Sequence, residues 1–108
     1  MSIKLPEIIA AYIQAQNAHD AKAILACFSE NALVHDEGED HHGKKAIVEW
    51  IDKTTKKYKP HFRPTKIEEG DEETVLAVKV SGSFEGSPVD LDFHFVIENE
   101  LIAGLNIQ

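Results

Sequence analysis

Asp36 is the carboxylate in this sequence whose neighbours best suit proton transfer. The alternation over residues 32–36 predicts a short strand in which Ala32, Val34 and Asp36 share one face. Desolvation on an apolar face disfavours the ionised form of a carboxyl group and raises its pKa. A raised pKa suits removal of a proton from a carbon beside a carbonyl group. The alternative is that Asp36 merely begins a solvated acidic loop, residues 36–40.

Other reactive residue types lie near this strand, but in patterns that predict no further chemistry. A divalent metal would need recognisable ligand spacing, which is missing, and neighbouring strand residues point to opposite faces, so we predict no metal site. Cys27 has no base predicted beside it and is expected to be a packing residue. The sequence has no nucleophile motif and no glycine-rich phosphate loop, so we expect no cofactor. The side chains of a type that could bind a metal here are His35, His41, His42, Glu37, Glu39 and Asp40.

Three amphipathic helices are predicted to position these residues. The first starts near Leu5, where Pro6 suits the first turn, and Asp20 is expected to cap a short second helix. A third helix follows Gly43, with lysines and acidic residues on the side opposite its apolar face. That apolar face carries Ala46, Ile47, Trp50, Ile51, Thr54 and Tyr58.

From Phe62 onward the pattern changes to the period of two that is typical of strands. The clearest strand spans residues 89–98, others are expected at 74–83 and 101–107, and a less regular one at 62–69 contains Pro64. These elements predict an α+β fold, a curved antiparallel sheet packed against three helices, in a single domain over residues 1–108. The space between helix and sheet is expected to be a ligand pocket or solid core, lined by Trp50, Leu91, Phe93 and Phe95.

The composition limits the classes of partner. The formal charge of −8 disfavours nucleic acid and anionic lipid, and no apolar run is long enough to span a membrane. The beginning of the chain lacks the pattern of a secretory signal, and a lone cysteine cannot form an internal disulfide, so a cytoplasmic location is expected.

Five segments of the chain carry a recognisable pattern, namely residues 11–20, 27–36, 42–47, 82–89 and 92–95. In this order they resemble SnoaL-like proteins and ketosteroid isomerases of the nuclear transport factor 2-like superfamily. The resemblance covers roughly residues 5–107 and implies a cone-shaped, cystatin-like fold with a pocket for a small apolar molecule. The superfamily includes isomerases, cyclases, dehydratases, hydrolases and non-catalytic modules, so the resemblance leaves the function open.

The resemblance also implies roles for individual residues. Tyr12 matches the tyrosine that hydrogen-bonds the substrate oxygen in ketosteroid isomerases, and Asp36 matches their general base. His42 lies where related proteins often carry a polar residue near the pocket rim. Leu91 stands where those isomerases carry a protonated aspartate, so we expect poor turnover of steroids. For Tyr12, the alternative role is an ordinary core residue.

Two functions are therefore compatible with the sequence. The first is an isomerase, cyclase or lyase that acts on a small apolar carbonyl compound through Asp36. The second is a non-catalytic module for hydrophobic-ligand binding or dimerisation. A homodimer through the sheet is expected because the superfamily commonly forms one and because Val96 and Ile102 interrupt otherwise polar outer strand faces.

Overall fold

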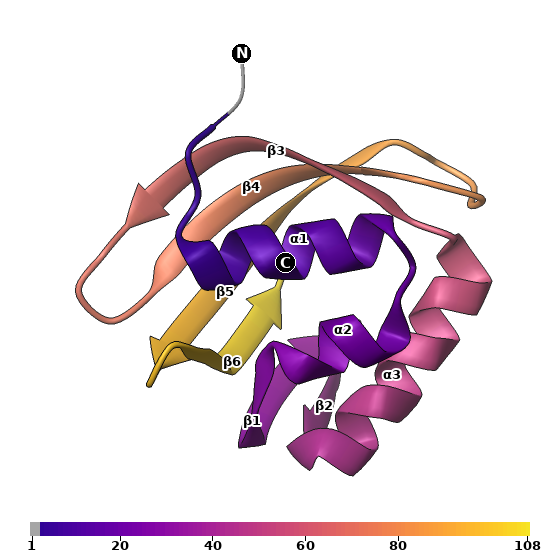
Figure 1. The fold of residues 1–108 in the computed structure, drawn as a ribbon. Helices are drawn as coiled ribbons and strands as arrows, with labels where there is room; N and C mark the ends of the chain where they lie inside the picture. The colour runs from indigo at the N-terminus through magenta and orange to yellow at the C-terminus, as the bar shows by residue number, and fades with distance from the viewer. Residues whose placement is uncertain (1–2) are drawn as a thin grey trace.

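The chain folds into a six-stranded sheet covered by three helices, as the computed structural model describes for residues 3–108 (Figure 1). The α+β class predicted from the sequence is confirmed. The helices are α1 (Glu7–Asn17), α2 (Ala21–Ala26) and α3 (Gly43–Tyr58). The strands are β1 (Phe28–Asp36), β2 (Glu39–His42), β3 (His61–Glu69), β4 (Thr74–Ser81), β5 (Val89–Glu98) and β6 (Leu101–Ile107).

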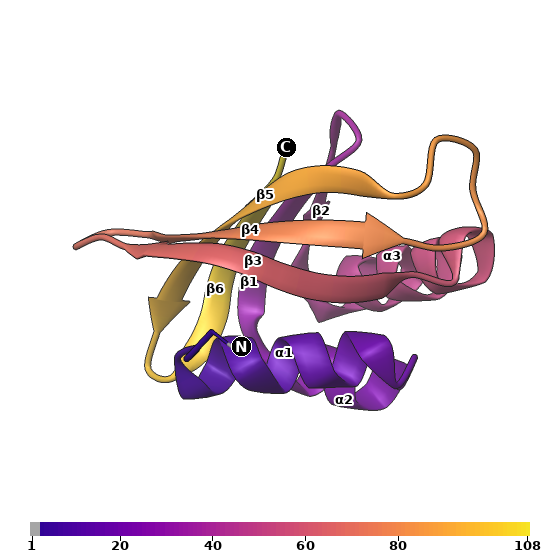
Figure 2. The same ribbon diagram turned by 90° about the horizontal axis from the view of Figure 1, so that it is seen from above.

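The strands are ordered β2-β1-β6-β5-β4-β3. Every neighbouring pair is antiparallel except β1 and β6, which are parallel, so the sheet is mixed at this one pair. A parallel pair requires a long connection, here the whole chain between β1 and β6. The sheet curves over α1, and α2 and α3 lie along the same side (Figures 1 and 2). The helices therefore cover the inner face of the sheet.

The helix ends follow local sequence signals. The Asp20 carboxylate accepts a 3.1 Å hydrogen bond from the Ala23 amide, which confirms the predicted cap of α2. Lys59 adopts a left-handed conformation, with φ of 46°, and ends α3 just before Pro60. Strand β1 begins four residues before the predicted strand because Phe28 already pairs with Ile102 of β6.

Pro64 lies in β3, which is an edge strand, and the pairing of β3 with β4 shifts register just after it. Both circumstances suit a residue without an N–H group to donate. The expected alternation of β5 is confirmed, because Phe93 and Phe95 are buried whereas Asp90 and Asp92 are exposed.

The expectation that Ile102 lies on the outer face of the sheet is wrong, because this side chain is fully buried. Ile97 pairs with Ile102 and Val96 pairs with Gly104, so Ala103 is an extra residue in β6. A bulge of one residue interrupts the alternation of faces, which turns both Ile102 and Leu105 inward. Val96 remains on the outer face, where it lines a shallow hollow.

Candidate functional site

A cavity of about 400 Å³ lies between the helices and the inner face of the sheet. It brings together five residues singled out in the sequence, namely Tyr12 from α1, Asp36 from β1, Trp50 from α3, and Leu91 and Phe93 from β5. Most of its wall is apolar, with a few polar groups, which is typical of a small-molecule site.

The Asp36 carboxylate lies at the end of β1 and lines the cavity. The preceding residues on the same face of this strand, Ala32 and Val34, are apolar and buried. The indole Nε1 of Trp50 donates a 3.0 Å hydrogen bond to Oδ2 of Asp36. Burial raises the pKa of Asp36 above its ordinary value, and the negative charge of Glu37 adds to the rise, while the Trp50 hydrogen bond opposes it. The indole thus holds the Oδ2 atom of the carboxylate and makes no hydrogen bond to Oδ1.

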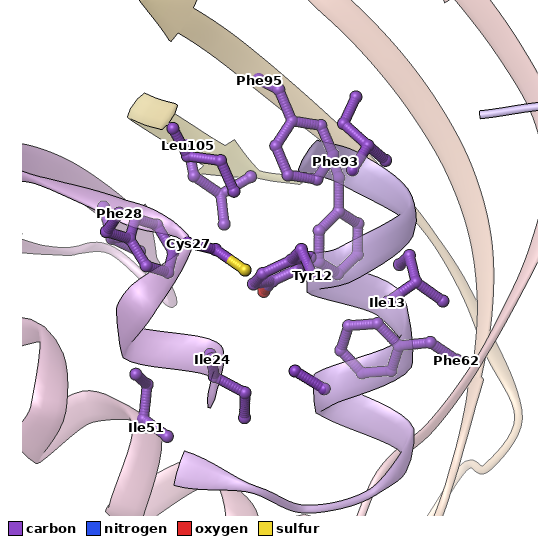
Figure 3. Close-up of a cluster of buried hydrophobic side chains, with 14 of the residues drawn as sticks. Tyr12, Ile13, Ile24, Cys27, Phe28, Ile51, Phe62, Phe93, Phe95 and Leu105 are labelled. Carbon is purple, nitrogen blue, oxygen red and sulfur yellow. The ribbon is translucent and has the colours of Figure 1, made fainter. Parts of the chain in front are cut away.

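Tyr12 lies deeper, and its ring is completely buried. Four phenylalanine rings surround it, and Figure 3 shows how they gather from separate parts of the chain. The Nε2 of Gln16 donates a 3.0 Å hydrogen bond to the Tyr12 hydroxyl oxygen. Burial raises the pKa of Tyr12 far above its ordinary value, so the hydroxyl stays protonated at neutral pH. The four rings are Phe28, Phe62, Phe93 and Phe95.

A second tyrosine belongs to the outer part of the cavity wall. The Tyr58 hydroxyl donates a hydrogen bond to the Glu37 carboxylate, and the Tyr58 ring makes an edge contact with Phe84. The ammonium group of Lys57 lies 5.0 Å from the Tyr58 ring centre. These groups are much more exposed than Tyr12, so the cavity has a buried end and a solvated end.

Sequence reasoning missed Gln16 as a lining residue, although the pattern held a signal. Gln16 continues the buried stripe of Ile9, Tyr12 and Ile13, so a polar residue occupies an apolar helix position. The role of Glu37 depends on its left-handed backbone, with φ of 53°, which no residue pattern predicts for a glutamate.

Two residues expected at the pocket do not line it. Phe95 is fully buried beneath Tyr12, with ring centres 5.6 Å apart, and belongs to the core. His42 is exposed at the end of β2, directly before α3, where its side chain makes no capping hydrogen bond.

The remaining reactive side chains lie outside the cavity. Within residues 3–108, no three His, Cys, Asp or Glu side chains are grouped as metal ligands would be. His35 Nδ1 lies 2.6 Å from the Asp40 carboxylate in an exposed pair. Cys27 is buried, and this raises the pKa of its thiol. In the same described range, none of the helices has the length and hydropathy needed to span a bilayer.

A solved structure from Sinorhizobium meliloti is similar to this chain in both sequence and fold. The protein SMa1630 of Sinorhizobium meliloti, named as a candidate polyketide cyclase, is 36% identical, with a TM-score of 0.92 over 96% of this chain and 95% of that one. Among curated proteins, none matches the chain.

More distant structures share the fold. A protein of Catenulispora acidiphila with a ketosteroid isomerase-like fold, in complex with trimethylamine, is 19% identical, with a TM-score of 0.85 over 97% of this chain and 86% of that one. SalBIII, an epoxide hydrolase/cyclase-like enzyme of pyran ring formation in salinomycin, is also 19% identical, with a TM-score of 0.79 over 94% and 86%. These likenesses, together with an NTF2-like and a cystatin-fold protein among the neighbours, confirm the predicted fold type.

The family model of the SnoaL-like domain matches residues 9–104, which is most of the chain. The predicted resemblance is confirmed by this match and by the relative from S. meliloti. The protein belongs to the SnoaL-like domain family.

Proposed function

We propose that this protein is a cofactor-independent isomerase, cyclase or lyase that acts on a small apolar carbonyl compound, with Asp36 as its general base. The observation that carries the proposal is the half-buried Asp36 carboxylate, held by Trp50 at the wall of an apolar cavity whose lining also includes Tyr12. A solvated surface position for Asp36 would have favoured a non-catalytic module instead.

The chemistry follows from these two groups. Asp36 takes a proton from the carbon beside the carbonyl group. The electron pair of that C–H bond forms a C=C bond, and the π pair of the C=O bond moves to the oxygen, so that the substrate becomes an enolate. Tyr12 donates a hydrogen bond to this oxygen where negative charge develops. In isomerisation the protonated Asp36 returns its proton to a neighbouring carbon. In ring closure the proton goes to the alkoxide formed when the enolate carbon adds to a second carbonyl group, and in elimination it goes to the leaving group. The fate of the enolate electrons decides between isomerisation, ring closure and elimination.

Two relatives support ring closure among these outcomes. The 36% identical protein carries the name of a candidate polyketide cyclase, and the more distant SalBIII is described in pyran ring formation. Steroid isomerisation is disfavoured because Leu91, which has no hydrogen to donate, lines the cavity, while Asp90 and Asp92 lie exposed on the opposite face. Losing one oxyanion donor lowers turnover about a hundredfold or more, and an assay on a Δ5-3-ketosteroid measures this.

The test measures hydrogen exchange at the carbon beside the carbonyl group of a simple ketone, so it does not require the natural substrate. Deuterium from D₂O should enter the methyl group beside the carbonyl of 2-acetylnaphthalene faster with the wild type than with D36N, as NMR would measure. Loss of exchange in D36N, with an unchanged far-UV circular dichroism spectrum, supports Asp36 as the base. Saturable binding of the ketone with equal exchange in both proteins would contradict catalysis and favour the alternative, a non-catalytic hydrophobic-ligand-binding module.

A homodimer through the outer sheet face is part of this proposal. Leu33 is 43% exposed there, and in the described residues Asn106 Oδ1 is buried without a hydrogen-bond partner. Leu33 and Val96 flank Gly104 in register, at a shallow hollow whose rim is mostly polar. A second copy would cover the leucine and bring donors to Asn106. Light scattering at micromolar concentration should give a dimer mass that L33K lowers, whereas a monomeric wild type would contradict the expectation.

A further inference from the structure

Gln16 is a polar side chain in the cavity wall. The proposed function gives roles to Asp36 and Tyr12 but none to Gln16. It is 4% exposed and lies on α1 one turn after Tyr12. Burial of an amide on an apolar helix face loses hydration and side-chain freedom, so a compensating contact is needed. The hydrogen bond from its Nε2 to the Tyr12 hydroxyl oxygen, at 3.0 Å, is that contact.

The direction of this hydrogen bond determines which group Tyr12 presents to a ligand. A phenol hydroxyl donates one hydrogen bond and accepts through its oxygen. The Gln16 amide occupies the accepting side, and the surrounding phenylalanine rings fix the ring of Tyr12. Within residues 3–108 no hydrogen bond from the Tyr12 hydroxyl to a protein acceptor is formed, and Tyr12 is one of the residues that line the cavity. A molecule that packs against this buried end can therefore accept the proton. Accepting a hydrogen bond also polarises the hydroxyl and makes it a better donor.

We propose that Gln16 is a positioning residue, which keeps Tyr12 a hydrogen-bond donor and so selects ligands that place an acceptor oxygen, a carbonyl or enolate, at the buried end of the cavity. The inference rests on the proposed function and adds the group that the ligand must carry. The opposite amide orientation, with Oε1 towards Tyr12, would consume the hydroxyl proton. The cavity would then favour ligands with a donor, such as alcohols.

The experiment uses 2-acetylnaphthalene labelled with ¹³C at its carbonyl carbon. The indole N–H resonance of Trp50, the one tryptophan of the chain, reports binding because this residue lines the cavity. The carbonyl ¹³C shift moves downfield when the oxygen accepts a hydrogen bond, which a purely structural role of Gln16 would not affect. The variants are Q16E, studied at a pH above the pKa of its new carboxyl group, found by ¹³C titration, so that the ionised carboxylate can only accept, and Q16M, which has no group that donates to Tyr12. Y12F defines the shift without the donor.

The matched control is Q14E, which adds the same charge at an exposed position of the same helix. We expect the wild type and Q14E to share one downfield carbonyl shift. Q16E should give the shift of Y12F and bind the ketone about tenfold more weakly, which is the effect of one lost hydrogen bond. Q16M should give an intermediate shift and lose about threefold in affinity, because the hydroxyl is no longer held in one direction.

The inference would be overturned if Q16E gave the same carbonyl ¹³C shift and the same affinity for the ketone as the wild type. If Q16E fails to fold by circular dichroism, wild-type values in Q16M overturn it equally. A wild type that binds the ketone with the same carbonyl shift as Y12F also overturns the role of Gln16, while deuterium exchange through Asp36 would leave the proposed function standing. A wild type whose Trp50 resonance does not respond to the ketone would contradict the proposed function itself.

Discussion

Tyr12 and Tyr58 line the same cavity but lie in opposite environments. Tyr12 is completely buried among phenylalanine rings, whereas Tyr58 is partly exposed and bonded to the Glu37 carboxylate. The pKa of each is raised, chiefly by burial at Tyr12 and chiefly by the hydrogen bond to Glu37 at Tyr58. The buried end thus combines close packing with a fixed polar group. At the solvated end, we expect substitutions to lower the free energy of unfolding only slightly.

Replacing each tyrosine by alanine should separate the two ends most clearly. We expect Y12A to lower the free energy of unfolding by about 3–5 kcal/mol, because a buried ring is lost and a void remains. Y58A should lower it by about 1 kcal/mol, mainly through the lost contact with Phe84. Urea denaturation measures both, and equal losses would show that the solvated end is as much a part of the core.

Trp50 connects the core to the site, and two substitutions separate these contributions. Trp50 is 5% exposed, so W50A should lower the free energy of unfolding by about 3–5 kcal/mol. W50F keeps much of the ring but removes the N–H group that lowers the pKa of Asp36. We therefore expect the Asp36 pKa to rise further in W50F, as carboxyl ¹³C titration would measure. An unchanged or lower pKa would show that the indole does not stabilise the charged form.

D36N should reveal what the buried carboxylate does to stability. Burial raises the folded-state pKa of Asp36 above its ordinary value of 3.8, so its contribution to stability is complete below that pH and is lost as pH rises through the folded-state pKa. We expect D36N to be more stable than the wild type at pH 7 and the difference to shrink below pH 3.8. Denaturation across this range measures the difference, and a less stable D36N at pH 7 would contradict a desolvated Asp36.

Removal of the hydroxyl groups alone should give the smallest effects. Y58F breaks a bond to an exposed carboxylate and should lower the free energy of unfolding by less than about 0.5 kcal/mol. Y12F leaves the buried Gln16 amide without its acceptor and should cost about 1–2 kcal/mol. A larger loss in Y58F than in Y12F, by thermal or urea denaturation, would reverse the comparison between the two ends.

The sequence predicted the elements more completely than it predicted the site. The alternation of β5 and the stripe of α3 are strong signals because burial on one face imposes a fixed period. Tyr12, Asp36 and Trp50 could be identified from these periods and from the family resemblance. Gln16 and Glu37 could not be assigned in this way, because one depends on a partner across a helical turn and the other on a left-handed backbone.

What the sequence determined by itself is which faces are apolar, and hence that helices must cover one side of a sheet. The tertiary structure decided where that alternation fails, since the extra residue at Ala103 turns Ile102 into the core. It also decided that the space between α1, α3 and β5 is partly open, with Phe95 packed in the core and Phe93 at the cavity wall. A period specifies the direction of a side chain, whereas an open volume depends on how far apart curved elements lie, and only their packing sets that distance.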